Sequence, residues 1–159
     1  MHRATRHSAS AGVTLMELLM VIAILLVLFA LTTRTFQGVN SGKAIDTEAL
    51  RIVTELNEAR SLTLSSKYAK PFGVHFDSSS VTLFEGATYS AGSATNTTAL
   101  LNSLVQVSSI DLAGGGSDVV FQRLTGKTAH SGTITLSLLS NASTSKIITI
   151  YATGLVDAQ

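Results

Sequence analysis

Glu17 is the residue of the N-terminal region whose chemistry most needs an explanation. It is the only charged residue between Gly12 and Leu31, and every residue from Leu18 to Leu31 is apolar. An ionised carboxylate near the centre of a membrane segment costs roughly 2.5–3.5 kcal/mol, so such a group usually has a charged partner. A cut after Gly12 would give Val13 an α-amino group, and an amine with a pKa of about 7.7–8.0 is largely cationic at neutral pH. We therefore expect Glu17 to pair with that amino group, on its own helix or on a neighbouring one.

The other polar residues do not form a catalytic constellation. The chain has no cysteine, its four histidines are scattered, and neither G-x-S-x-G nor H-E-x-x-H occurs. Asp111 and Asp118 flank a triple glycine and could contact Ca²⁺, but two acids without further ligands do not make a metal site. We predict that the protein is not an enzyme and that it needs no metal or cofactor.

The charge balance argues against a nucleic-acid partner. Eleven Lys and Arg residues stand against ten Asp and Glu residues, and two of the cations lie before Gly12. Nucleic-acid binding depends mainly on clustered cations that meet phosphates. Arg123 and Lys127, on either side of a turn, could make at most a weak nucleic-acid contact, and ordinary solvation explains them better.

The stretch from Val13 to Leu31 is long enough for a helix of roughly 28 Å, close to the roughly 30 Å hydrocarbon thickness of a bilayer. We therefore expect a single transmembrane helix there. A secretory signal peptide is the rival interpretation, since Arg3 and Arg6 precede the apolar run. The segment that follows, TTRTFQ, offers no clear small-residue cleavage site, which favours the helix.

Downstream residues predict an amphipathic helix followed by strands. Between Lys43 and Lys67, apolar or small residues recur at helical spacing, namely Ile45, Ala49, Ile52, Val53, Leu56 and Ala59. Pro71 ends the helical region. About six β-type runs follow, at 72–77, 81–85, 104–110, 118–122, 133–138 and 146–151, and the Gly- and Ser-rich segment 86–99 is expected to be a surface loop. His75 should point to the wetter face of its strand.

The N-terminal motif resembles the start of a type IV prepilin or type II secretion pseudopilin. It combines a short basic leader ending in Gly12, a mature start at Val13 and a glutamate, Glu17, as the fifth mature residue. The resemblance implies that a prepilin peptidase cuts after Gly12 and methylates Val13, and that Glu17 pairs with the N-terminus of an adjacent subunit during assembly. Val13 replaces the usual Phe, and Arg34 stands where many members have a proline.

The rest of the chain is similar to the GspH/FimT branch of minor pilins and pseudopilins. NEARSLTLSSKYAKPFGVHFD, DVVFQRLTGKT and the pair TITLSL and IITIYATGLV carry this likeness. It implies an α+β, pilin-like fold, in which a long N-terminal helix, with a transmembrane first half and an amphipathic second half, packs on an antiparallel β-sheet domain. The implied domains are a leader (1–12), a transmembrane and filament-core helix (13–31), the rest of the helix (32–70) and a β-rich domain (71–159).

The resemblance also implies a function and a location. The protein would be a structural subunit at or near the tip of a type II secretion pseudopilus or type IV pilus, aiding assembly or substrate contact. Its partners would be prepilin peptidase, other pilins or pseudopilins through the N-terminal helix, and the inner-membrane assembly platform. It would be a single-pass inner-membrane protein with its C-terminal domain in the periplasm, until it is incorporated into a pilus.

Two alternatives remain at this point. Some FimT-like members bind DNA through a Gly-Arg-x-Arg segment, but the matching residues here are Gly154, Leu155, Val156 and Asp157, which lack both arginines. An adhesive or DNA-binding tip pilin would instead use the loops 86–99 and 140–146. A plain membrane-anchored domain with an uncleaved N-terminus is the other alternative, and it leaves Glu17 unexplained.

Overall fold

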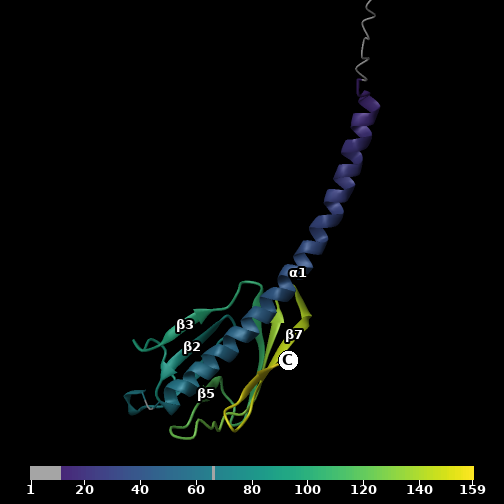
Figure 1. Ribbon diagram of the computed structural model, residues 1–159. Coiled ribbons are helices and arrows are strands. Elements are labelled where there is room, and N and C mark those ends of the chain that lie inside the picture. Colours follow the sequence, from purple (N-terminus) through teal and green to yellow (C-terminus); the bar gives the residue numbers. More distant parts are fainter. Residues whose placement is uncertain (1–11, 66) are drawn as a thin grey trace, which may run out of the picture. The chain divides into compact units, whose positions relative to one another are not determined.

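The computed structural model describes residues 12–65 and 67–159, except for the side chains of 31–41 and 67. One helix, α1 (Leu15–Leu64), opens this part of the chain, and a short 3-10 helix, η1 (Lys67–Ala69), follows it (Figure 1). The chain divides into two compact units, Met1–Val39 and Asn40–Gln159, and the division falls inside α1.

A capping interaction sets the start of α1. The backbone N–H of Glu17 donates to Thr14 Oγ1 at 3.2 Å, and the N–H of Leu18 donates to the Thr14 carbonyl at 3.1 Å. Thr14 is therefore the N-cap residue. Glu17 stands three residues beyond it, in the T-x-x-E pattern that is typical of helix starts.

The first half of α1 does not meet the requirements for a membrane span. In the part of the chain that the structure describes, no helix is both long enough and apolar enough to cross a membrane. The predicted transmembrane helix over 13–31 is therefore wrong, and so is the predicted single-pass inner-membrane location. The predicted fold class is wrong for the same reason, because it gave the N-terminal helix a transmembrane first half.

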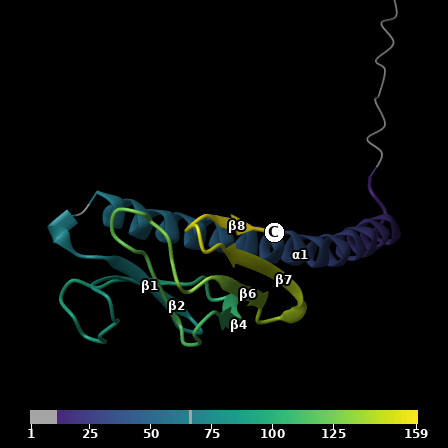
Figure 2. The ribbon, with the colours of Figure 1, turned by 90° about the horizontal axis from the view of Figure 1, so that it is seen from below.

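Eight strands follow within the described residues, and they form two sheets. The sheet of β3-β2-β1-β5 and the sheet of β4-β6-β7-β8 are each four-stranded and antiparallel throughout (Figure 2). We call them the first and the second sheet. The strand bounds are β1 (Phe72–Phe76), β2 (Ser80–Glu85), β3 (Thr97–Leu100), β4 (Val105–Leu112), β5 (Asp118–Val120), β6 (Gly132–Leu138), β7 (Asn141–Ile150) and β8 (Val156–Ala158).

The core of the second unit lies between residues 42–64 of α1 and the two sheets. One stripe of the helix is buried there, and it is the stripe that the helical spacing predicts: Ile45, Ala49, Ile52, Leu56 and Ala59. Strand residues at alternating positions meet it, among them Val74 and Phe76 of β1 and Ile148 and Ile150 of β7. Burial of these side chains, each worth roughly 1.5–3 kcal/mol when large, holds the unit together without disulfides.

The strands differ from the predicted set at three places. β3 occupies the end of the segment that was expected to be a loop, and β8 pairs with β7 at the C-terminus. The expected loop over 140–146 is largely strand, because β7 begins at Asn141 and pairs with β6 directly after a tight turn. That segment is therefore not a free contact loop.

Candidate functional site

The residues expected to be processed and to direct assembly lie at the beginning of the described chain. Gly12 and Val13 precede α1 and are exposed, and a Cβ built on Gly12 would meet no atom within 4 Å. Glu17 is exposed in the first turn of α1. The leader before Gly12 lies outside the described residues. The bond between Gly12 and Val13 is thus accessible, and the pairing of Glu17 with an amino group stays a prediction.

Glu17 also stabilises the first turn of α1, a role that its cost inside a membrane does not predict. A carboxylate in the first turn lies near the positive end of the helix dipole, which is worth about 0.3–1 kcal/mol at an exposed site. The T-x-x-E pattern from Thr14 to Glu17 is the sequence signal for this role. Glu17 therefore has a local stabilising function whether or not it also pairs with another subunit.

The described apolar stretch of α1 is exposed around its whole circumference. Its large apolar side chains have exposed fractions between 45% and 76%, and they occupy every side of the helix: Leu15, Met16, Leu18, Leu19, Met20, Val21, Ile22, Ile24, Leu25, Leu26, Val27, Leu28 and Phe29. A helix that is apolar on every side is normally buried against other structure. Most of the large apolar side chains that are exposed in the described chain lie in this stretch.

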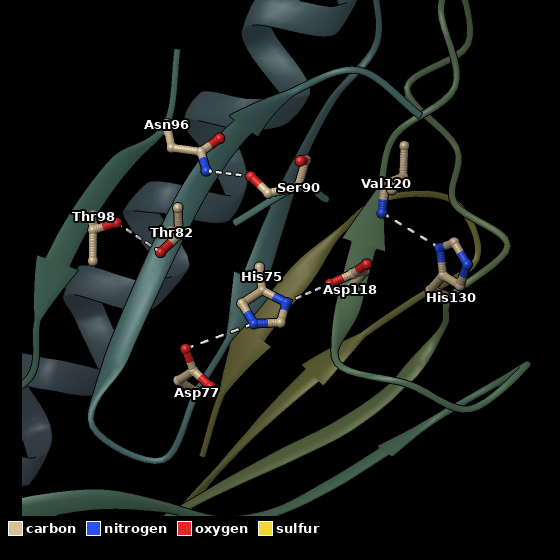
Figure 3. Close-up of polar contacts among 9 residues, drawn as sticks. All are labelled: His75, Asp77, Thr82, Ser90, Asn96, Thr98, Asp118, Val120 and His130. Atoms are coloured by element: carbon tan, nitrogen blue, oxygen red, sulfur yellow. Dashed lines mark hydrogen bonds and ion pairs between the residues drawn. The ribbon is translucent and has the colours of Figure 1, made fainter. Parts of the chain in front are cut away.

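A polar cluster lies on the outer face of the first sheet and centres on His75. This histidine projects from β1 toward Asp118 of β5, and its Nδ1 lies 2.6 Å from Asp118 Oδ1 (Figure 3). Its Nε2 lies 3.7 Å from Asp77 Oδ2, just beyond the end of β1. The expectation that His75 faces away from the core is confirmed, but its acidic partners could not be predicted before the pairing of β1 with β5 was known.

Tyr89 covers this histidine and thereby fixes the loop that follows β2. The rings of His75 and Tyr89 are stacked, with centroids 3.8 Å apart and planes at 5°, and Tyr89 also meets Phe84 edge to face. The loop is closed on itself by the side chain of Asn96, which donates to the carbonyl of Ser90 at 2.9 Å (Figure 3). The predicted surface loop is thus held against the sheet by an aromatic contact.

A histidine held by an aspartate can act as a general base, but none of the hydrogen bonds within the described residues joins His75 to a serine or threonine hydroxyl. No group of three or more His, Asp or Glu side chains in the described chain is placed to hold a metal ion. Asp111 and Asp118 lie on β4 and β5, in different sheets, so the triple glycine does not bring them together as ligands.

Arg123 and Lys127 project into solvent from one tight turn. The N–H of Gln122 donates to the Lys127 carbonyl at 2.8 Å, which closes the turn, and both cationic side chains are exposed. On the inner side of the turn, Arg60 Nε of α1 donates to the Gly126 carbonyl at 3.1 Å. The two exposed cations provide weak attraction for phosphate at most, because a phosphate site usually combines several such groups.

The C-terminal segment compared above with a DNA-binding motif begins with a glycine that the fold requires. Gly154 is buried with φ +81°, and a Cβ added there would lie 1.9 Å from the Gly126 carbonyl oxygen. The turn at Gly154 therefore packs on the turn at Gly126, next to Arg60.

Comparison with protein-family models finds no family that matches the chain, and comparisons with curated proteins and with solved structures find no similar protein. These comparisons give no support to a pilin or protein-secretion classification. The likeness to minor pilins accordingly rests on the sequence motifs alone.

Proposed function

We propose that the protein is a pilin-like structural subunit of a pilus-type filament, and that its segment from Val13 to Ala30 packs against the corresponding helices of neighbouring subunits. The observation that carries the proposal is the exposure of this segment on every side. Each large apolar side chain gains roughly 1.5–3 kcal/mol on full burial. The segment therefore favours an assembly that surrounds it with other helices.

The charge pattern supports the same proposal. Glu17 is the single charged residue of the described segment before Leu31, so nothing else interrupts an apolar helix contact. The second unit has its own core and needs no partner to bury it. The protein thus combines a unit that has its own core with a helix segment whose large apolar side chains are exposed, as a filament subunit requires.

The proposed function includes processing at Gly12. The accessible bond between Gly12 and Val13 follows a basic leader and precedes the helix start, so a prepilin peptidase would reach it without unfolding α1. The new α-amino group would lie beside the Thr14 cap and one turn before Glu17. We propose prepilin peptidase and other pilin-like subunits as the partners.

Intact mass and N-terminal sequencing test this function. The protein is isolated from its own host and from an otherwise identical strain that lacks prepilin peptidase. We expect a chain that begins at methylated Val13 in the first strain and a chain that retains the leader in the second. A chain that retains the leader in both strains would contradict the assignment to the pilin class.

A further inference from the structure

A polar hollow lies where the end of β1 meets β4, at a junction of the two sheets. Its volume is about 390 Å³, within the roughly 300–1,000 Å³ of small-molecule sites in proteins. Its polar lining consists of one carboxylate and four serine side chains, those of Asp77, Ser78, Ser108, Ser109 and Ser117. All of them belong to the second unit, so the hollow does not depend on what covers the apolar stretch of α1.

Two backbone hydrogen bonds hold the walls of the hollow in place. The N–H of Val107 in β4 donates to the Ser78 carbonyl at 2.9 Å, which joins the turn after β1 to the second sheet. The N–H of Phe76 donates to the Ser117 carbonyl at 2.9 Å, which joins β1 to the segment before β5. The lining is therefore carried by paired backbone from three different segments.

The serine hydroxyls supply most of the hydrogen-bonding groups in the hollow. A β-bulge between Val107 and Ser109 interrupts the pairing of β4 with β6. Neighbouring strand residues otherwise alternate between faces, so the bulge explains why Ser108 and Ser109 both line the hollow. Ser108 donates to a backbone carbonyl of β6, whereas none of the hydrogen bonds within the described residues uses the hydroxyls of Ser78, Ser109 or Ser117. Each of these three hydroxyls can donate one hydrogen bond to a ligand and accept others from it.

The charge of the lining selects the class of ligand. Asp77 follows β1 and points toward His75, with its Oδ2 3.7 Å from His75 Nε2, and an ionised carboxylate only accepts hydrogen bonds (Figure 3). No Lys or Arg side chain of the described chain lines the hollow, so a phosphate or carboxylate ligand would meet a negative charge without a cation. The lining thus favours a neutral ligand that brings its own hydroxyl donors.

We propose that the hollow binds one neutral pyranose sugar. The ring edge of such a sugar carries hydroxyls, which would donate to Asp77 and exchange hydrogen bonds with the serines. Its faces carry C–H groups, which would lie on the apolar part of the lining, formed by Phe76, Val107 and Ile110. A few polar groups that fix orientation beside an apolar surface are the usual composition of a small-molecule site.

Saturation-transfer NMR on the full-length protein tests the proposal. The protein is kept in a detergent without a sugar head group, so that the detergent does not compete for the hollow. Glucose, galactose and mannose are each titrated as the free sugar and as the methyl glycoside. Asp77→Asn and Ser109→Val remove a charged acceptor and a hydroxyl from the lining, and Asp157→Asn and Ser145→Val make the same exchanges at exposed strand residues outside it. Thermal unfolding verifies that each variant is folded.

We expect at least one of the three sugars to bind saturably to the wild type. Asp77→Asn and Ser109→Val should each raise its Kd by roughly tenfold, and the two control variants should change it by less than about twofold. Binding of the methyl glycoside would identify the ligand as the terminal unit of a glycan, and binding of the free sugar alone would identify it as a free sugar. Both results support the hollow as a sugar site.

Three results would overturn the proposal. The first is the absence of saturable binding with all of the sugars and glycosides. The second is binding that Asp77→Asn and Ser109→Val leave unchanged. The third is a response of the Ser78 and Ser109 amide signals to Ca²⁺ alone and to no sugar, which would make the hollow a cation site. None of these results bears on the filament function, because that proposal involves no sugar.

Discussion

The two stretches of α1 with described side chains differ in the exposure of their apolar residues. Residues 15–30 are apolar on every side, and even the least exposed of the large ones, Ile22, is 45% exposed. Residues 42–64 carry one apolar stripe, from Ile45 to Ala59, and its members are at most 2% exposed. The second stretch packs on the two sheets, whereas the large apolar side chains of the first are exposed.

This contrast shows that a stretch of this chain can be helical without being buried in a core. Both stretches belong to one helix by backbone hydrogen bonding, yet only the amphipathic stretch contributes to the core of the second unit. The large apolar side chains of the other stretch are exposed, so they would contribute stability only on burial. Substitutions in the two stretches should therefore change different measurable quantities.

The largest expected effect comes from truncating the same residue type in each stretch. Leu56→Ala removes a fully buried side chain, so the free energy of unfolding should fall by about 2–5 kcal/mol. Leu25→Ala removes a side chain that is 59% exposed and should change that free energy by less than about 0.5 kcal/mol. Urea denaturation of the full-length proteins, followed by far-UV circular dichroism, measures both. A similar loss of unfolding free energy in the two variants would contradict the difference between the buried and the exposed stretch.

A glycine pair tests how tightly the second stretch is held by the C-terminal turns. Gly154 and Gly92 have φ +81° and +82°, but a Cβ at Gly154 would overlap the Gly126 carbonyl and approach Arg60, whereas one at Gly92 would meet nothing within 4 Å. Gly154→Ala should therefore destabilise by roughly 3 kcal/mol and Gly92→Ala by about 1 kcal/mol. Thermal unfolding checks the difference, and an equal effect would show that backbone strain alone matters.

Two threonines of the second stretch allow the loss of a buried hydroxyl to be compared with the loss of an exposed one. Thr63 Oγ1 donates to the Ala59 carbonyl at 2.8 Å and accepts the buried N–H of Phe72 at 2.8 Å, which ties α1 to β1. Thr54 Oγ1 makes the corresponding helical bond, to the Leu50 carbonyl, at an exposed site. Thr63→Val should cost about 1–3 kcal/mol because that N–H loses its acceptor, and Thr54→Val should be nearly neutral. Comparable urea midpoints for both variants would contradict this account.

The smallest expected effect is a dependence on pH at Glu55. Burial raises the pKa of this carboxyl above its usual value of 4.5, Glu58 raises it further, and Arg51 lowers it by less. The folded state then binds the proton more tightly than the unfolded state, so stability falls as the pH rises through this raised pKa. Glu55→Gln should therefore be slightly more stable than the wild type at pH 7 and equal to it at pH 3. A variant that is less stable than the wild type at pH 7 would contradict a raised pKa for Glu55.

Much of the second unit could be predicted because its signals are local. Helical spacing identified the buried stripe from Ile45 to Ala59, and alternating apolar residues with a serine turn identified the hairpin of β1 and β2. β3 was missed because TTAL follows a long polar segment and exposes most of its side chains, so its strand character comes from pairing with β2. β8 has three residues, too few for a periodic signal.

The polar sites could be predicted only in part. The outward direction of His75 follows from alternation, but its contact with Asp118 depends on pairing between strands 43 residues apart, and its stacking with Tyr89 depends on the path of a loop. The T-x-x-E start at Thr14 is a local signal that was present in the sequence and not used. The apolar stretch was recognised, yet length and composition alone led to the wrong expectation of a membrane span.

One measurement tests most directly whether residues 13–30 are covered by other subunits. Wild type, Leu26→Asp and Leu124→Asp are expressed in the host, and each protein is quantified in sheared filaments and in whole cells. Leu26 and Leu124 are 64% and 80% exposed, so neither change disturbs a buried site in the chain itself. We predict that only Leu26→Asp is lost from the filament fraction while its cellular level is kept, because an aspartate would be buried between helices. Normal incorporation of Leu26→Asp, or absence of the wild type from filaments, would contradict the account.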